Sequence, residues 1–177
     1  MNINNRRTIF NGLVVNIEEM DVEIGSLGYH KYQIIRHPGG SAVLPVHDDG
    51  TISLIRQLRP AVGKSMLEIP AGRLGHQEPP MDCATRELLE ETGIRATKLI
   101  PLGTIYSSPG VFDEIIHLFA ATGLSQGIAQ PELDEDIEVL RISTTEVQTM
   151  ILDGRICDAK TMAAILRWEL LCHTTAT

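Results

Sequence analysis

Hydrophobic and polar positions along the chain predict mostly short strands. In residues 8–36, short apolar runs are interrupted by acidic residues and by a glycine-bounded turn at 25–28. Beyond residue 40 the apolar runs become denser, and an Asp-Asp-Gly turn at 48–50 joins the first two strands of that region. The strands predicted there span residues 41–45, 52–57, 67–69, 99–106, 114–121 and 137–142.

Helical signals occur at three places. Met81, Ala84 and Leu88 recur at the spacing of one helix face, which predicts a half-buried helix with its acidic face turned outward. Gly93 follows at the position where a left-handed residue ends such a helix. Two later helices are predicted. A capping box of Ser143 with Glu146 begins the first, which ends at Gly154. Asp158 caps the second, which runs to about Leu171.

The chain changes character at His-Pro-Gly-Gly, residues 37–40. This turn-rich stretch separates an N-terminal β subdomain, residues 1–38, from a larger domain, residues 39–177. Strands interleaved with a few helices predict an α/β or α+β layer architecture for the larger part. At 177 residues the chain is long enough to bury a core of its own.

Composition limits the classes of function. A net charge of −8 disfavours non-specific binding to nucleic acid or to an anionic membrane. Three widely spaced cysteines without a Cys-x-x-Cys pair predict neither a disulfide framework nor a zinc site, and buried reduced thiols are expected instead. The N-terminus lacks the apolar stretch of a signal peptide, and no run reaches the length of a membrane span, so we expect a cytoplasmic protein.

The densest chemistry lies in residues 72–94, GRLGHQEPPMDCATRELLEETGI. On a helix, Glu87, Glu90 and Glu91 fall within roughly 100° of arc, so their carboxylates repel one another. A hard divalent cation such as Mg²⁺ or Mn²⁺ would neutralise that cluster. Arg86 lies four residues before Glu90 and can hold that carboxylate while leaving Glu87 and Glu91 free for metal. The alternative is an ordinary solvated acidic helix face.

This segment resembles, with no mismatch, the Nudix box of the Nudix hydrolase family. The resemblance implies a Nudix fold, a mixed β-sheet sandwiched between helices, and here a small N-terminal antiparallel β-sheet besides. It also implies metal-dependent hydrolysis of a diphosphate bond in a nucleoside diphosphate joined to another group. The metal ligands that it implies are the carboxylates of Glu87 and Glu91, Glu90 as a supporting or shared ligand, and the backbone carbonyl of Ala71, with Glu78 supporting the ligands.

Segments outside the box are similar to the ADP-ribose pyrophosphatase branch of this family. Pro109 lies sixteen residues after Gly93 in the sequence YSSPGVFDE, and Pro-Gly by itself would indicate only a turn. The other segments of that branch, in its order, are RQLRP at 56–60, LEIPAG at 67–72 and LDEDIEV at 133–139. This similarity implies that the substrate is ADP-ribose and that the products are AMP and ribose 5-phosphate.

The same similarity implies roles in binding and catalysis. Glu135 in the acidic loop is expected to orient or deprotonate the attacking water, with Asp134 or a box glutamate such as Glu90 as alternatives. Arg86 supports the catalytic glutamates. The residues expected at the substrate are Arg36, Arg56 and Arg59, whose guanidinium forks suit phosphate, together with Glu68, Gly72, Pro109, Gly110 and Glu114.

Residues 1–36 carry many apolar side chains and form a segment too short to bury them alone. In the resembling branch this sheet packs on a second subunit, which implies a homodimer; packing within one chain is the alternative. Two other kinds of function remain open. One is hydrolysis of a different compound, such as GDP-mannose, NADH or a diadenosine polyphosphate, and the other is a non-catalytic ADP-ribose sensor.

Overall fold

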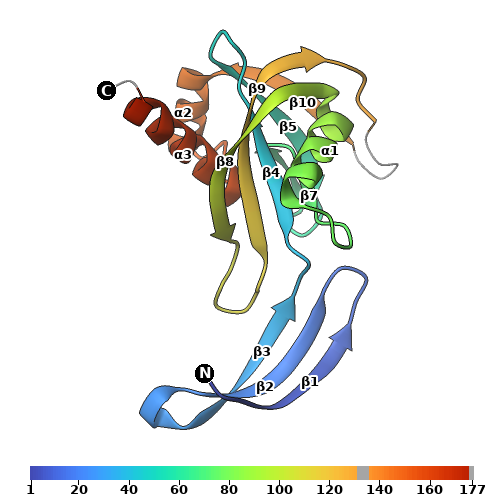
Figure 1. The fold of residues 1–177 in the computed structure, drawn as a ribbon, viewed down its shortest axis with the longest axis vertical. Helices are drawn as coiled ribbons and strands as arrows, with labels where there is room; N and C mark the ends of the chain where they lie inside the picture. Colours follow the sequence, from blue (N-terminus) through green and yellow to red (C-terminus); the bar gives the residue numbers. More distant parts are fainter. Residues whose placement is uncertain (131–135, 176–177) are drawn as a thin grey trace. The chain divides into compact units, whose positions relative to one another are not determined.

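The computed structural model describes residues 1–130 and 136–175, and it divides into two compact units (Figure 1). The first unit consists of Met1–Gly39 and Tyr106–Ile115. The second unit consists of Gly40–Ile105 and Ile116–Thr177. The inserted stretch of the first unit is therefore the connection between two strands of the second.

Two sheets form the frame of the second unit. The larger sheet is mixed and has the strand order β7-β4-β9-β8, in which β4 runs parallel to β9 and antiparallel to β7. The smaller sheet is antiparallel, with the order β10-β5-β6. The bounds of these strands are Gly40–Pro45 for β4, Thr51–Arg59 for β5, Lys64–Glu68 for β6, Ala71–Arg73 for β7, Ile94–Tyr106 for β8, Ile115–Gln126 for β9 and Ile137–Ser143 for β10.

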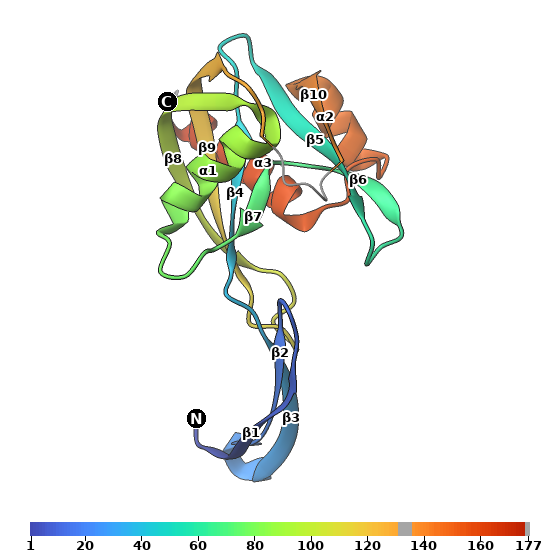
Figure 2. The same ribbon diagram turned by 90° about the vertical axis from the view of Figure 1, so that its right-hand side faces the viewer.

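In the part of the chain that the structure describes, helices pack on both faces of the larger sheet. Helix α1, Pro80–Thr92, lies against one face, and α2, Thr144–Leu152, with α3, Ala159–Thr175, lies on the other side (Figure 2). Strand β4 is buried on both faces: Ala42 and Leu44 belong to the core cluster beneath α3, whereas Val43 belongs to the cluster beneath α1. The predicted fold, a mixed sheet between helices, is confirmed.

The predicted ends of the helices are largely as expected. The Ser143 hydroxyl accepts a hydrogen bond from the Glu146 backbone N–H at 3.3 Å, and Asp158 accepts one from the Thr161 N–H at 3.0 Å. Gly93 has a φ of 70°, the left-handed conformation that ends α1. Helix α3 extends beyond the predicted stop at Leu171, to Thr175.

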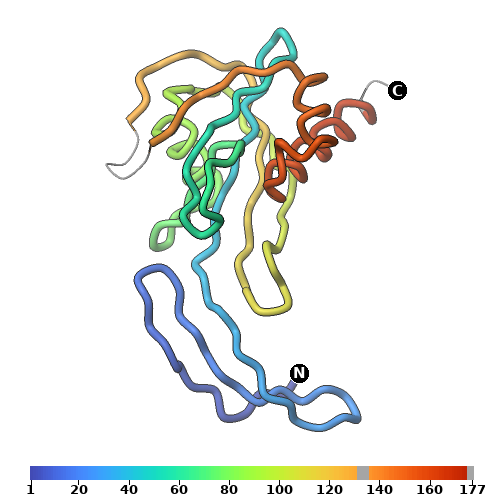
Figure 3. Tube along the Cα trace, turned by 180° about the vertical axis from the view of Figure 1, so that it is seen from behind, coloured from blue at the N-terminus to red at the C-terminus, as the bar shows by residue number. Residues whose placement is uncertain are grey.

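The first unit contains a small antiparallel sheet of order β1-β2-β3, as predicted (Figure 3). Its strands are β1, Ile3–Asn11, β2, Asn16–Glu23, and β3, Tyr29–Arg36. Strand β1 begins earlier than expected, because polar residues there are paired across the sheet: Arg7 donates to Glu19 at 2.8 Å. Within the same unit, the 106–115 stretch is tied to β3 where the Ile35 N–H donates to the Val111 carbonyl at 2.8 Å.

Two expectations about burial are wrong in part. Met81 is 44% exposed, because it lies in the first turn of α1, where the helix begins at the edge of the domain core. Of the three cysteines, only Cys83 is buried, as was expected for all three, while Cys157 and Cys172 are exposed near the two ends of α3. Within residues 1–130 and 136–175, no helix combines the length and apolarity that a bilayer span requires.

Candidate active site

Helix α1 is held in place by the packing of its apolar face and by the cap at its C-terminal end. Ala84 and Leu88 are buried in one cluster with Val43 of β4 and Phe119 of β9. At the end of the helix, the Gly93 N–H donates to the Leu89 carbonyl at 2.8 Å. The apolar face therefore determines which side chains of the helix are directed toward the neighbouring strand β7.

Glu87 and Glu91 lie against β7, so the prediction of an outward acidic face is wrong for these two residues. Glu91 is 2% exposed, and its Oε2 accepts a hydrogen bond from the Ala71 N–H at 3.0 Å. The buried Glu87 carboxylate fills the space beside Gly72, where an added Cβ would lie 1.7 Å from Oε1. Glycine at position 72 is what lets the backbone of β7 approach the helix this closely.

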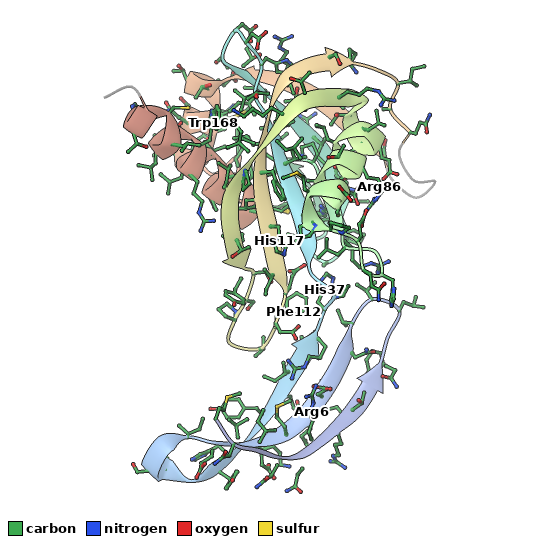
Figure 4. All side chains as sticks on the ribbon, viewed as in Figure 1. Arg6, His37, Arg86, Phe112, His117 and Trp168 are labelled. Carbon is green, nitrogen blue, oxygen red and sulfur yellow. The ribbon has the colours of Figure 1, made fainter. Side chains whose placement is uncertain are left out.

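Arg86, labelled on α1 in Figure 4, connects the glutamates of this region. Its Nη1 donates to Glu90 at 2.9 Å, as predicted, but also to Glu87 Oε1 at 2.6 Å. Its Nε and Nη2 donate to the two oxygens of Glu78 at 2.8 and 3.0 Å. The expectation that Arg86 leaves Glu87 free is wrong, because one guanidinium with five N–H donors reaches three carboxylates.

These contacts shift the titration of the groups involved. The Arg86 guanidinium, helped by the Gly75 backbone N–H, lowers the pKa of Glu78 to about 2. In return the carboxylates, Glu78 foremost, raise the pKa of Arg86. Burial raises the pKa of the adjacent Cys83 thiol to about 11, which favours the protonated thiol at neutral pH.

A cavity of about 460 Å³ opens between β7 and α1. Its lining consists of Ala71, Gly72, Arg73, Leu74, Gly75, Glu78, Arg86 and Glu87. Carboxylate and carbonyl oxygens are the donors that Mg²⁺ and Mn²⁺ prefer, so the donor set fits a hard cation in type. Within residues 1–130 and 136–175, no three Asp, Glu, His or Cys side chains are grouped so that they could hold a metal ion. The positive charge between Glu87 and Glu90 comes from the Arg86 guanidinium.

A second charged cluster lies where β5, β6 and α3 meet. Arg59, the last residue of β5, donates from Nε and Nη2 to the two oxygens of Glu68, each at 2.9 Å. Glu68 also accepts from Lys160, which lies 3.1 Å from Asp158. Arg59 and Glu68 were predicted at the site from sequence, whereas Lys160 was missed. A cation in the first turn of a helix opposes the helix dipole, and this signal was available in the sequence.

Other predicted residues have partners that belong to neither of these two clusters. Arg56 forms an exposed ion pair with Glu138. In the first unit, Arg36 donates to Glu18 at 2.6 Å and to Asp113 at 2.9 Å, which raises its pKa.

The 106–115 stretch supplies the remaining predicted residues of the first unit. Glu114 lies 3.3 Å from His37 Nδ1, and Pro109 and Gly110 line an apolar cavity of about 410 Å³. Glu135 and its alternative Asp134 lie outside the described residues, so their roles stay predictions.

Comparisons with known proteins agree with the motif. The NUDIX domain family matches residues 36–165 of this chain. An ADP-ribose pyrophosphatase of Bacillus subtilis (strain 168) is 40% identical over 167 residues, which cover 93% of this chain and 90% of that protein. A methanol dehydrogenase activator of Bacillus methanolicus is 40% identical over 164 residues, covering 92% and 89%.

Among solved structures, an ADP compounds hydrolase aligns with a TM-score of 0.85 at 21% identity. The alignment covers 98% of this chain and 95% of that one. At this identity the likeness concerns the fold.

The Arg86 contacts predict a pH dependence of stability. Because the pKa of Glu78 is about 2 in the folded protein and ordinarily 4.5, the unfolded chain binds the proton first as the pH falls. The contribution of Glu78 is therefore present above pH 4.5 and lost between about pH 4.5 and pH 2. We expect the free energy of unfolding, measured by urea denaturation at several pH values, to fall less steeply over this range in Glu78→Gln than in the wild type. An equal change of the free energy of unfolding with pH in the two proteins would contradict the lowered pKa of Glu78.

Proposed function

Because the chain belongs to the NUDIX domain family, we propose that it hydrolyses the diphosphate bond of ADP-ribose to give AMP and ribose 5-phosphate. The reaction class is that of a Nudix pyrophosphohydrolase. The substrate is supported by the 40% identity to an ADP-ribose pyrophosphatase over almost the whole of both chains.

One observation carries the proposal: two glutamates of a single helix are buried beside the backbone of Ala71 and Gly72. Burying a carboxylate is costly unless charge and hydrogen bonds offset it. A solvated acidic face would need no such burial and no glycine beneath it. A cation site accounts for both features.

We propose Mg²⁺ as the cofactor, with Mn²⁺ as a substitute. Glu87, Glu91 and the Ala71 carbonyl would hold it, and Glu90 would be a supporting or shared ligand. When bound, a divalent cation supplies charge neutralisation at the phosphoryl oxygens. Arg86 and Glu78 orient Glu87 and Glu90, since the guanidinium donates to Glu78, Glu87 and Glu90 together.

The remaining roles are assigned by resemblance. Glu135 is proposed to orient or deprotonate the attacking water, with Asp134 or Glu90 as alternatives. Arg59 is the best supported phosphate ligand, because its guanidinium lies at a strand end in the same unit as the α1 glutamates. The other proposed substrate contacts are Arg36, Arg56, Glu68, Gly72, Pro109, Gly110 and Glu114.

We also propose that the protein is a homodimer in which residues 1–38 form the dimerisation subdomain and residues 39–177 the hydrolase domain. Phe10, Leu13 and Val14, at the β1–β2 turn, are exposed apolar side chains. Such a patch is typical of a surface that packs against a partner. A cytoplasmic location is supported by the spacing of the three cysteines, which includes no Cys-x-x-Cys pair and predicts no disulfide framework.

Two rival functions make different predictions. A Nudix enzyme that acts on another nucleoside diphosphate sugar or dinucleotide would use the same glutamates with a different substrate. A non-catalytic ADP-ribose sensor would bind the ligand without turnover. The buried carboxylates favour an enzyme, because a pure binder of an anionic ligand gains nothing from negative charge at its site.

Glu91→Gln tests the cation site. The amide oxygen of Gln can still accept the Ala71 N–H, so the fold should persist while the charge is lost. We expect kcat with ADP-ribose and Mg²⁺ to fall by more than about a hundredfold, since residues that only support metal ligands already cost about 10- to 100-fold. Mn²⁺ affinity, followed by calorimetry, should fall in parallel. Glu146→Gln, on the exposed first turn of α2, is the matched control. Wild-type turnover in Glu91→Gln would remove this residue from the ligand set.

A substrate panel tests the specificity. We expect kcat/KM for ADP-ribose to exceed the values for GDP-mannose, NADH and diadenosine polyphosphates by at least about tenfold, measured as phosphatase-coupled phosphate release. Comparable values across the panel would leave only the family-level activity. Tight binding of ADP-ribose without any turnover would favour the sensor.

Charge placed on the apolar turn tests the dimer. We expect Phe10→Glu combined with Val14→Glu to convert a dimer into a monomer in sedimentation velocity, because buried charge at an interface is strongly unfavourable. Leu152→Glu, at an exposed apolar side chain of the second unit, is the control and should leave the dimer intact. A wild-type protein that sediments as a monomer at micromolar concentration and is fully active would refute the proposal.

A further inference from the structure

Lys160 is a partly buried cation with two carboxylate partners. Its side chain is 11% exposed, and its Nζ donates to Glu68 and lies 3.1 Å from Asp158 Oδ1. Glu68 is itself 2% exposed and is held by Arg59 on its other side. Two cations and two carboxylates thus form one balanced cluster at the junction of β5, β6 and α3.

The backbone around Lys160 fixes this arrangement. Lys160 is in the first turn of α3, directly after the Asp158 cap, which accepts from the Thr161 N–H and hydroxyl at 3.0 and 2.6 Å. The Thr161 hydroxyl in turn accepts from the Ile69 N–H at 2.9 Å. The start of α3 is therefore anchored to the residue that follows Glu68, and Lys160 cannot move independently of it.

The position is unfavourable for a lysine in isolation. The first turn of a helix carries the positive end of the helix dipole, and burial of an ammonium group adds a desolvation cost. A helix that needed only a stable start would place an acidic or neutral residue there. A specific use of this positive charge would account for the residue.

We propose that Lys160 is a positioning residue for the substrate diphosphate: it holds Glu68 ionised and in place, so that Arg59 can be shared between Glu68 and a phosphate. The proposal rests on the proposed function. Arg59 contacts Glu68 through Nε and Nη2, while Nη1 carries two further N–H donors and 35% of the side chain is exposed.

The charges explain why a second cation is needed. When a phosphate contacts Arg59, two anionic groups face a single guanidinium, and in a poorly solvated site they repel each other. Lys160 adds a positive charge on the buried side of Glu68, so the carboxylate need not compete with the phosphate for Arg59. Without Lys160, Arg59 would remain bound to Glu68 and would be less able to bind a phosphate. Loss of Lys160 should therefore raise KM more than it lowers kcat.

A double-mutant cycle in steady-state kinetics tests this inference. We expect Lys160→Met to raise KM for ADP-ribose by about tenfold with a change in kcat below about threefold, and Lys160→Arg to restore KM to within about threefold of the wild type. In the Arg59→Met background, Lys160→Met should have no further effect on KM, because Lys160 acts through Arg59. Lys98→Met, at an exposed lysine of β8, is the matched control. If Lys160→Met does not fold, Lys160→Gln, which can still donate to Glu68, replaces it.

Two outcomes overturn the inference. One is a lower melting temperature of Lys160→Met with KM unchanged, which means that the cluster only stabilises the fold. The other is a full effect of Lys160→Met on KM in the Arg59→Met background, which means that Lys160 acts independently of Arg59. Failure of the proposed function is separate: if the wild type cleaves a different compound of the panel, the cycle is measured with that compound. If it cleaves none, the dissociation constant of ADP-ribose replaces KM.

Discussion

The donation of one guanidinium to three carboxylates is the interaction on which the candidate site depends. Glu78, Glu87 and Glu90 would repel one another on and beside a single helix, and Arg86 brings them together with distances of 2.6–3.0 Å. Because Glu78 lies before the helix and Arg86 within it, the same contacts hold the loop after β7 against α1. The ion pairs that balance the charges of the site therefore also join the segment after β7 to α1.

Close backbone approach is the second constraint. Gly72 leaves the space that the Glu87 carboxylate fills, and the Ala71 N–H donates to Glu91. These contacts direct two carboxylates toward a strand of only three residues. In the cluster around Glu68 the numbers are reversed: two cations, Arg59 and Lys160, donate to one buried carboxylate. In each cluster, cations lie next to the carboxylates and offset their negative charge.

Sequence reasoning recovered the parts of the molecule that carry local signals. The Glu-rich segment, the helix ends at Gly93 and Ser143, and most of the strands were predicted, because spacing and capping are properties of neighbouring residues. The orientation of Glu87 and Glu91 was not predicted, since it depends on the pairing of β7 with β4, and a strand of three residues has no periodicity to detect. The start of β1 was missed because cross-strand ion pairs, not apolar alternation, stabilise it. Lys160 was missed because its partner Glu68 is remote in the sequence.

The parallel pairing of β4 with β9 has a consequence for the order of folding. Residue 40 pairs with residue 116, so the closed loop between them contains β7, α1 and every described carboxylate that surrounds Arg86. Closing a loop of this length requires conformational entropy to be lost before the native contacts form, and such non-local pairing is slow. On the ribosome, α1 can become helical early and can meet β7, but the apolar cluster beneath α1 is completed only when Phe119 of β9 has emerged. The packing that holds the helix of the candidate site in place is therefore completed late in chain synthesis.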